Sequence, residues 1–111
     1  MTDAELVAEA RTGSDVPFTR LVERHHAAVR GFLRRLLGGG WAEADDVAQE
    51  VVLTAWSNLH RLKQGDGFRS WLLGIAWRKA QDRIRSARRG AARDAEWLEM
   101  VGAASSLSLA D

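Results

Sequence analysis

The sequence predicts an all-α fold, a compact bundle of about four helices. Apolar residues recur three and four positions apart along most of the chain, and the alternating pattern of a half-buried strand is absent. The 111 residues are 46% hydrophobic, a composition typical of one small folded domain. The sequence contains no cysteine, which excludes a disulfide scaffold, a thiolate metal site and a cysteine nucleophile.

The first helix is expected over about residues 3–11. Thr2 or Asp3 is a suitable N-cap, and Gly13 is expected to end the helix. This first segment is acidic and amphipathic, unlike a secretory signal, and no apolar run approaches the ~18–20 residues of a membrane span. We therefore expect a cytoplasmic protein without a membrane partner.

The second helix is expected over about residues 15–37. Asp15 is the expected N-cap, and Pro17 falls in the first turn, where its missing N–H costs little. Three glycines at 38–40 stop the helix. Its apolar stripe consists of Phe18, Leu21, Val22, Val29, Phe32, Leu33 and Leu36.

The third helix, at about 42–59, carries more apolar residues than its core face needs. At ~100° per residue, one arc holds Ala48, Val51, Val52, Ala55 and Leu59. Leu53 and Trp56 fall outside this arc, among the polar residues Asp45, Asp46, Gln49 and Glu50. Two explanations stay open: an interaction surface with an apolar centre and a polar rim, or an ordinary exposed Leu53 beside a partly buried Trp56.

Residues 60–67, "HRLKQGDG", read as a loop, and a fourth helix is expected over about 67–89. Its first part is apolar nearly all round, which is typical of the centre of a bundle. Trp71 and Trp77 are therefore expected in the core, although stacking on unpaired bases is the alternative. Its second part is basic, with Arg78, Arg85, Arg88 and Arg89 on one side and Lys79 and Arg83 on another.

The charges are segregated along the chain although the net charge is only +1. Residues 42–59 hold four acids and no Lys or Arg, whereas residues 69–93 hold eight bases and one acid. This asymmetry indicates two different partners, one of them a polyanion. The simpler alternative is that these basic residues lie at a solvated helix C-terminus, where the helix dipole favours positive charge.

We expect a helical domain over residues 1–90 and a short helix or linker tail over residues 91–111. Gly90 is expected to break the fourth helix, and the last residues are small, as in linkers.

Three segments resemble, in order and spacing, the second conserved region of bacterial extracytoplasmic-function sigma factors, within the sigma-70 family of RNA polymerase initiation subunits. They are "DAELVAEARTGSDVPFTRLVERHHAAV", "AEADDVAQEVVLTAW" and "FRSWLLGIAWRKAQDRIRSARR". The resemblance covers about residues 3–89. Most of its specificity comes from "DDVAQEV" followed about twenty residues later by "FRSWLLGIA".

The resemblance implies a non-enzymatic transcription initiation domain without a cofactor. In the family, the acidic helix docks on the coiled-coil clamp of the largest subunit of the RNA polymerase core. This role maps to Asp45, Asp46, Gln49 and Glu50, and helix geometry adds Leu53 and Trp56.

The resemblance also implies binding to promoter DNA. In the family, the next loop and the basic helix recognise and melt the minus-ten element, and a flipped non-template base enters a pocket of that loop. This role maps to His60, Arg61, Lys63, Arg69, Arg78, Lys79, Arg83, Arg85, Arg88 and Arg89. An anti-sigma factor is a further partner that the resemblance allows.

Two departures from the family pattern stand out. The family usually reads I-A-R-N where this chain has Ile75, Ala76, Trp77 and Arg78, so that Arg78 takes the usual Asn position. The family's domain for the minus-thirty-five element has no counterpart in the residues after the basic helix. We expect a domain-level piece of a longer protein, rather than a truncated product or a protein with this module alone.

Other functions fit the sequence less well. The adjacent His25 and His26 point ~100° apart on a helix and lack the i, i+4 spacing of a zinc pair, and His60 is isolated, so an enzyme is disfavoured. A helix-turn-helix reader of duplex DNA needs a shorter recognition helix. A protein-interaction module without productive promoter binding, either held by an anti-sigma factor or acting as a decoy, stays open as the alternative.

Overall fold

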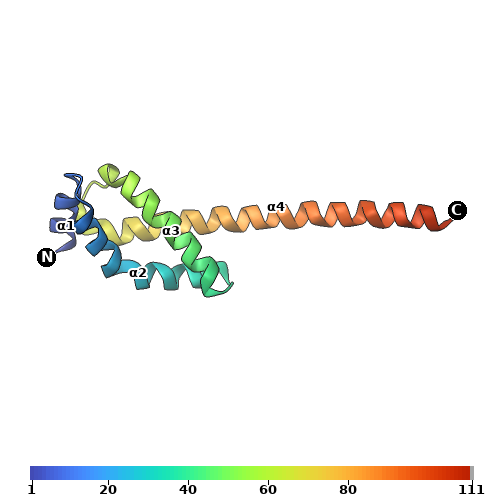
Figure 1. Cartoon of the computed structure of the whole chain (residues 1–111), viewed down its shortest axis with the longest axis horizontal. Helices are drawn as coiled ribbons and strands as arrows, with labels where there is room; N and C mark the ends of the chain where they lie inside the picture. The colour runs from blue at the N-terminus through green and yellow to red at the C-terminus, as the bar shows by residue number, and fades with distance from the viewer. Residues whose placement is uncertain (111) are drawn as a thin grey trace. The chain divides into compact units, whose positions relative to one another are not determined.

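Helices make up nearly all of the regular structure of this chain. The computed structural model describes the backbone of residues 1–110 and the side chains of residues 1–103. This part contains α1 (Asp3–Ala10), α2 (Asp15–Leu37), α3 (Trp41–Ser57) and α4 (Phe68–Ala110), as Figure 1 shows. Two 3-10 helices, η1 (Leu59–Arg61) and η2 (Gly65–Gly67), lie between α3 and α4. The prediction of an all-α fold is confirmed.

The chain forms two units, one over Met1–Gln81 and the other from Asp82 onward. The first unit contains α1, α2, α3 and the first turns of α4, and the second contains the rest of α4. The domain over residues 1–90 and the tail over residues 91–111 stay predictions.

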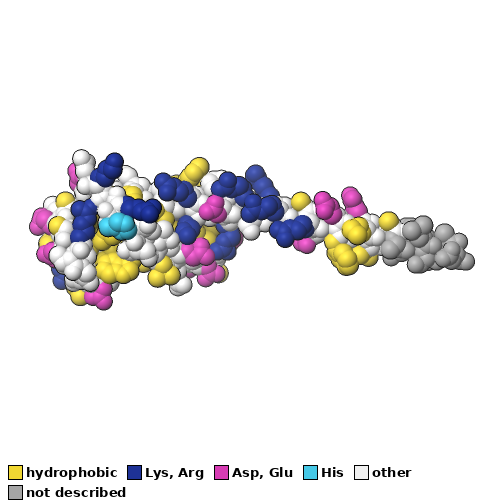
Figure 2. Space-filling view, turned by 90° about the horizontal axis from the view of Figure 1, so that it is seen from above, with side chains coloured by type: hydrophobic (Ala, Val, Ile, Leu, Met, Phe, Trp, Pro, Cys, Tyr) yellow, Lys and Arg dark blue, Asp and Glu magenta, His cyan; other side chains and the backbone are white. Residues whose placement is uncertain are grey.

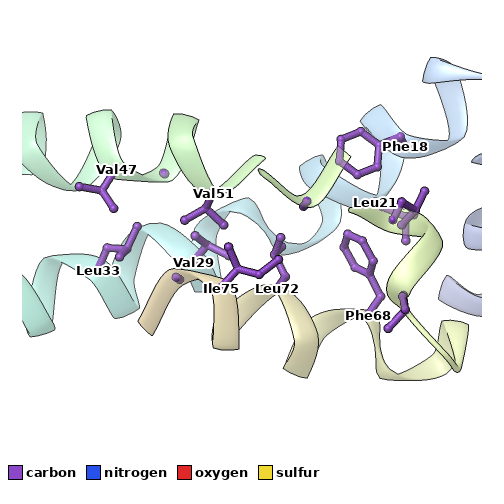
Figure 3. Close-up of a cluster of buried hydrophobic side chains, with 14 of the residues drawn as sticks. Phe18, Leu21, Val29, Leu33, Val47, Val51, Phe68, Leu72 and Ile75 are labelled. Carbon is purple, nitrogen blue, oxygen red and sulfur yellow. The ribbon is translucent and has the colours of Figure 1, made fainter. Parts of the chain in front are cut away.

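One hydrophobic core holds the first unit together. Figure 3 shows side chains of α2, α3 and α4 meeting in it, and α1 adds Leu6 and Val7. The α2 stripe behaves as predicted, because Phe18, Leu21, Val29 and Leu33 are buried while Val22, Phe32 and Leu36 pack against the core. On α3 and η1 the predicted arc is buried at Ala48, Val51, Ala55 and Leu59 and partly buried at Val52. Burying each large apolar side chain contributes about 1.5–3 kcal/mol, so this core is the main source of stability.

The helix ends follow local chemistry, with one correction. The Thr2 hydroxyl accepts a hydrogen bond from the Glu5 N–H at 3.2 Å, and the Glu5 carboxylate accepts one from the Thr2 N–H at 3.4 Å, which forms a capping box. The Thr2 hydroxyl also donates to the Glu5 carboxylate at 3.0 Å, and this bond, together with the one from the Thr2 N–H, lowers the pKa of Glu5. The prediction of Asp15 as the N-cap of α2 was wrong: Ser14 occupies that position, and Asp15 is the first helical residue, where an acid suits the helix dipole. Gly38 ends α2 in the left-handed conformation, at φ 69°.

The expected break at Gly90 was also wrong, because α4 continues through it. A glycine inside a helix costs only about 1 kcal/mol relative to alanine. Its neighbours Arg88, Arg89, Ala91 and Ala92 are strong helix formers, which offsets this cost. The expected loop at 60–67 likewise contains short helical turns, η1 and η2.

The segment between α3 and α4 contacts the α1 region at two points. The Arg11 guanidinium donates a hydrogen bond to the Leu62 carbonyl, and the Leu62 side chain is buried. At Gly65 the backbone approaches α1 so closely that an added Cβ would lie 2.8 Å from the Ala4 Cα. Only glycine fits there without a shift of the backbone.

We predict that Gly65→Ala lowers the free energy of unfolding by about 1–3 kcal/mol, since the new methyl group would clash with the backbone of α1. Gly67→Ala is the matched control, because a Cβ at Gly67 meets no atom within 4 Å. Urea denaturation of both variants measures the difference. Equal stability of the two variants would show that the segment does not depend on the close approach at Gly65.

Candidate functional site

The outer face of α3 combines acids with an exposed leucine. Asp46, Gln49 and Glu50 are exposed, and Leu53 is 68% exposed. The predicted position of Leu53 outside the core is therefore confirmed. Its exposure places an apolar side chain at the centre of a polar surface.

A shallow apolar groove of about 330 Å³ borders this surface, and we name it the α3 groove. It is lined by Val22, His26, Ala48, Gln49, Val52 and Leu53. The lining residues come from α2 and α3, so the packing of these two helices creates the groove. Leu53 belongs both to the exposed face and to the groove, which makes the two a continuous surface.

Asp45 differs from the other predicted acids because α2 supplies it with a partner. The Arg30 guanidinium donates two hydrogen bonds to the Asp45 carboxylate, from Nε at 2.5 Å and from Nη2 at 3.2 Å. This bonding lowers the pKa of Asp45, with a smaller contribution from His26, and raises the pKa of Arg30. The Arg30 guanidinium also lies 4.2 Å from the centre of the Trp41 ring. Asp45 therefore joins α3 to α2.

We predict a pH-dependent contribution of Asp45 to thermal stability. Because its pKa is lowered in the folded chain, the stabilisation is complete above the ordinary value of 3.8 and is lost as the pH falls through the lower folded value. Asp45→Asn should lower Tm near neutral pH, and the difference from wild type should shrink as the pH falls below 3.8. Arg30→Gln removes the other partner and should give the same pH profile in circular dichroism melts. A Tm difference that does not change with pH would contradict this role of the ion pair.

A second concave surface lies where α1 meets the segment after α3, and we name it the loop hollow. Its volume is about 540 Å³, within the range of about 300–1,000 Å³ typical of small-molecule sites. It is lined by Ala10, Arg11, Gly13, Trp56, Leu59, His60, Leu62 and Lys63. The structure thus brings together the predicted DNA-binding residues His60 and Lys63, and it adds Arg11, which sequence reasoning missed. Arg11 gives no sequence signal because its contact joins residues 51 positions apart.

Trp56 lines the loop hollow and not the α3 groove. Its ring packs on Phe18 with a centroid distance of 4.8 Å, and 38% of the residue is exposed. Trp56 therefore belongs partly to the core and partly to the surface. Its assignment to the polymerase-binding surface stays a prediction.

The basic residues of α4 fall in both units. In the first unit Arg69 and Arg78 are exposed and Lys79 is half-buried, while Arg61 is exposed on η1. In the second unit Arg85, Arg88 and Arg89 are exposed and Arg83 is half-buried. Arg85 donates to Asp82 at 2.7 Å. Figure 2 shows basic side chains gathered near the start of the second unit, with a group of acidic and apolar side chains further along it.

The two adjacent histidines lie in different surroundings. His25 is buried, and its Nε2 lies 2.7 Å from the Asp3 carboxylate, which also accepts a hydrogen bond from Arg24 at 2.9 Å. His26 is exposed and lines the α3 groove. Sequence reasoning missed the structural role of His25, although it lies four residues from both Leu21 and Val29 on the α2 stripe.

Within the described residues, no group of three His, Cys, Asp or Glu side chains could hold a metal ion. In the same part of the chain, no helix combines the length and the apolar character needed to cross a membrane.

Comparison with known proteins assigns the family. The model of the Sigma-70 region 2 family matches residues 21–90, and the chain belongs to this family. The match includes the α3 groove and ends in the basic part of α4. No solved structure gives a significant match.

Three curated relatives carry sigma factor names. The RNA polymerase sigma factor CarQ of Myxococcus xanthus is 36% identical over 78 residues, which are 70% of this chain and 44% of the relative. The RNA polymerase sigma factor CnrH of Cupriavidus metallidurans is 34% identical over 86 residues, 78% of this chain and 44% of the relative. The ECF RNA polymerase sigma factor SigM of Mycobacterium tuberculosis is 32% identical over 87 residues, which are 78% of this chain and 44% of the relative. The matched part is therefore less than half the length of each relative.

Proposed function

We propose that this chain is a transcription initiation factor domain that binds the RNA polymerase clamp and promoter DNA. Membership in the Sigma-70 region 2 family and the names of the three relatives support this role. The proposal has a protein-binding half and a DNA-binding half. Each half rests on a different surface of the first unit, so each can be tested alone.

The observation that carries the protein-binding half is the exposed Leu53 beside the α3 groove. An apolar centre with a charged rim is the usual anatomy of a protein interface. Because the rim contains Asp46 and Glu50, it favours a basic partner. A helix that presents an apolar side chain flanked by bases fits this surface, and we assign it to the coiled-coil clamp of the largest polymerase subunit.

We predict that Leu53→Arg weakens binding of a purified clamp fragment at least tenfold, since it places a charge in the apolar centre. Gln49→Ala, at the groove edge, should have a smaller effect in the same direction. Leu98→Arg is the matched control, because Leu98 is 67% exposed and lies in the second unit. Calorimetry with the clamp fragment measures the affinities, and circular dichroism checks the fold. Unchanged clamp binding by the Leu53 and Gln49 variants would refute the protein-binding half of the proposal.

The DNA-binding half rests on the loop hollow. Trp56, Leu59 and Leu62 supply apolar walls, and Arg11, His60 and Lys63 supply donors that suit a phosphate or a base edge. Unstacking a base costs a few kcal/mol, which aromatic stacking of about 1–3 kcal/mol per base and pocket hydrogen bonds can offset. We propose that this hollow receives the unpaired base of the minus-ten element. The exposed arginines Arg69 and Arg78, on the first turns of α4, would then hold the backbone of the strand.

We predict that the chain binds mixed-sequence single-stranded DNA with a strong salt dependence. Arg78→Gln should reduce the slope of log affinity against log salt by about 0.7, the value for one phosphate contact on a single strand. Arg35→Gln is the control, because Arg35 is an exposed arginine on α2 that is not among the predicted DNA-binding residues. Fluorescence anisotropy at several salt concentrations gives the slopes. A slope near zero for wild type would refute the DNA-binding half and favour an interaction-only module.

A further inference from the structure

Trp77 of α4 is exposed where its sequence neighbours predict burial. On a helical projection of α4, Trp77 falls on the same apolar side as Leu73 and Ala80. Ala80 is fully buried and Leu73 packs against the core, but Trp77 is 51% exposed. A half-exposed indole keeps a large flat apolar surface in water. This surface belongs to neither the α3 groove nor the loop hollow.

The surface one turn before Trp77 is open. Helical side chains lean toward the N-terminus of their helix, so the helix surface beside Trp77 on that side is the turn that contains Leu73 and Gly74. A Cβ added at Gly74 would meet no atom within 4 Å outside its own helix backbone and chain neighbours. Ser70, one further turn back, is small and exposed. The ring therefore borders a shelf of small residues, Ser70 and Gly74, with space for a flat group.

The part of α4 that carries this shelf has only positive charges. Within the first unit, α4 carries Arg69, Arg78 and Lys79 and no acid. Arg78 is exposed, and it forms no ion pair with another described residue. The surroundings of Trp77 thus differ from those of Leu53, which has acidic neighbours. They favour a polyanion that also offers flat apolar faces, and single-stranded nucleic acid has both properties because its bases are unpaired.

We propose that Trp77 and the Gly74 shelf form a stacking platform for an unpaired DNA base, with Arg78 bound to the adjacent phosphate. This inference rests on the proposed DNA-binding function and deepens it, because it adds a base position separate from the loop hollow. Trp77 departs from the family pattern that the chain resembles, which usually has an arginine at this position. The positive charge of that arginine is absent at position 77, but Arg78 supplies one at the next position.

The platform is tested by anisotropy with mixed-sequence single-stranded DNA and with an abasic strand of the same length. Trp77→Ala should weaken binding to normal DNA about tenfold, the size expected for one stacked base. Trp77→Phe should keep part of the affinity, and Gly74→Leu should weaken binding by filling the shelf while it favours the helix. On the abasic strand, wild type and Trp77→Ala should bind alike. Trp97→Ala is the matched control, because Trp97 is 64% exposed and lies in the second unit.

The salt slope separates stacking from charge. Trp77→Ala should leave the slope unchanged because it removes no charge, whereas Arg78→Gln should reduce it. Unchanged binding by Trp77→Ala, or an equal loss on the abasic strand, overturns the platform. Weaker clamp binding by Trp77→Ala with intact DNA binding also overturns it and assigns Trp77 to the protein interface. Absence of salt-dependent DNA binding by wild type would instead refute the DNA-binding half of the proposed function. Failure of the platform and failure of the proposed function therefore give different results.

Discussion

Burial of the Phe68 ring is the interaction on which the rest of the first unit depends. The ring is fully buried, and its centroid lies 6.4 Å from that of Phe18, 5.7 Å from that of His25 and 5.9 Å from that of Trp71. Because Phe68 is the first residue of α4, its burial fixes where the preceding segment ends. Arg11 and Gly65 hold the middle of that segment on α1. Together these contacts shape the loop hollow and set the direction in which the first turns of α4 expose Trp77 and Arg78.

The small residues of α3 explain why its outer face can carry function. Its buried positions are alanines and valines, which let α3 lie close to α2 and complete the core from one side of the helix. Leu53 is therefore not needed for folding, and its exposure has a cost that a partner would remove. Asp45 and Arg30 secure the N-terminal part of α3 without occupying the α3 groove. Trp56 lies on the side of α3 that faces the loop hollow.

Helical geometry alone predicted the four helices and one side of each, but not the continuation of α4 through Gly90 or the short helical turns before it. It placed Leu53 outside the core correctly, because the α3 arc is narrow and well filled. It was wrong for Trp77, since periodicity gives the direction of a side chain and not which helix covers that direction. The burial of His25 was not predicted, because the spacing of the histidines was compared only with that of metal ligands and not with the apolar stripe of α2. Arg11, Leu62 and Gly65 could not be predicted, because their contacts join segments that are distant in sequence.

The central claim is that clamp and DNA bind two separate surfaces of one small unit. Hydroxyl-radical footprinting read by mass spectrometry tests it most directly, because it reports the accessibility of individual side chains with either partner. The clamp fragment should protect Leu53 and leave His60 and Trp77 reactive. Single-stranded DNA should protect His60 and Trp77 and leave Leu53 reactive. Protection of all three residues by one partner, or of none by either, would show that the two partners do not bind separate surfaces.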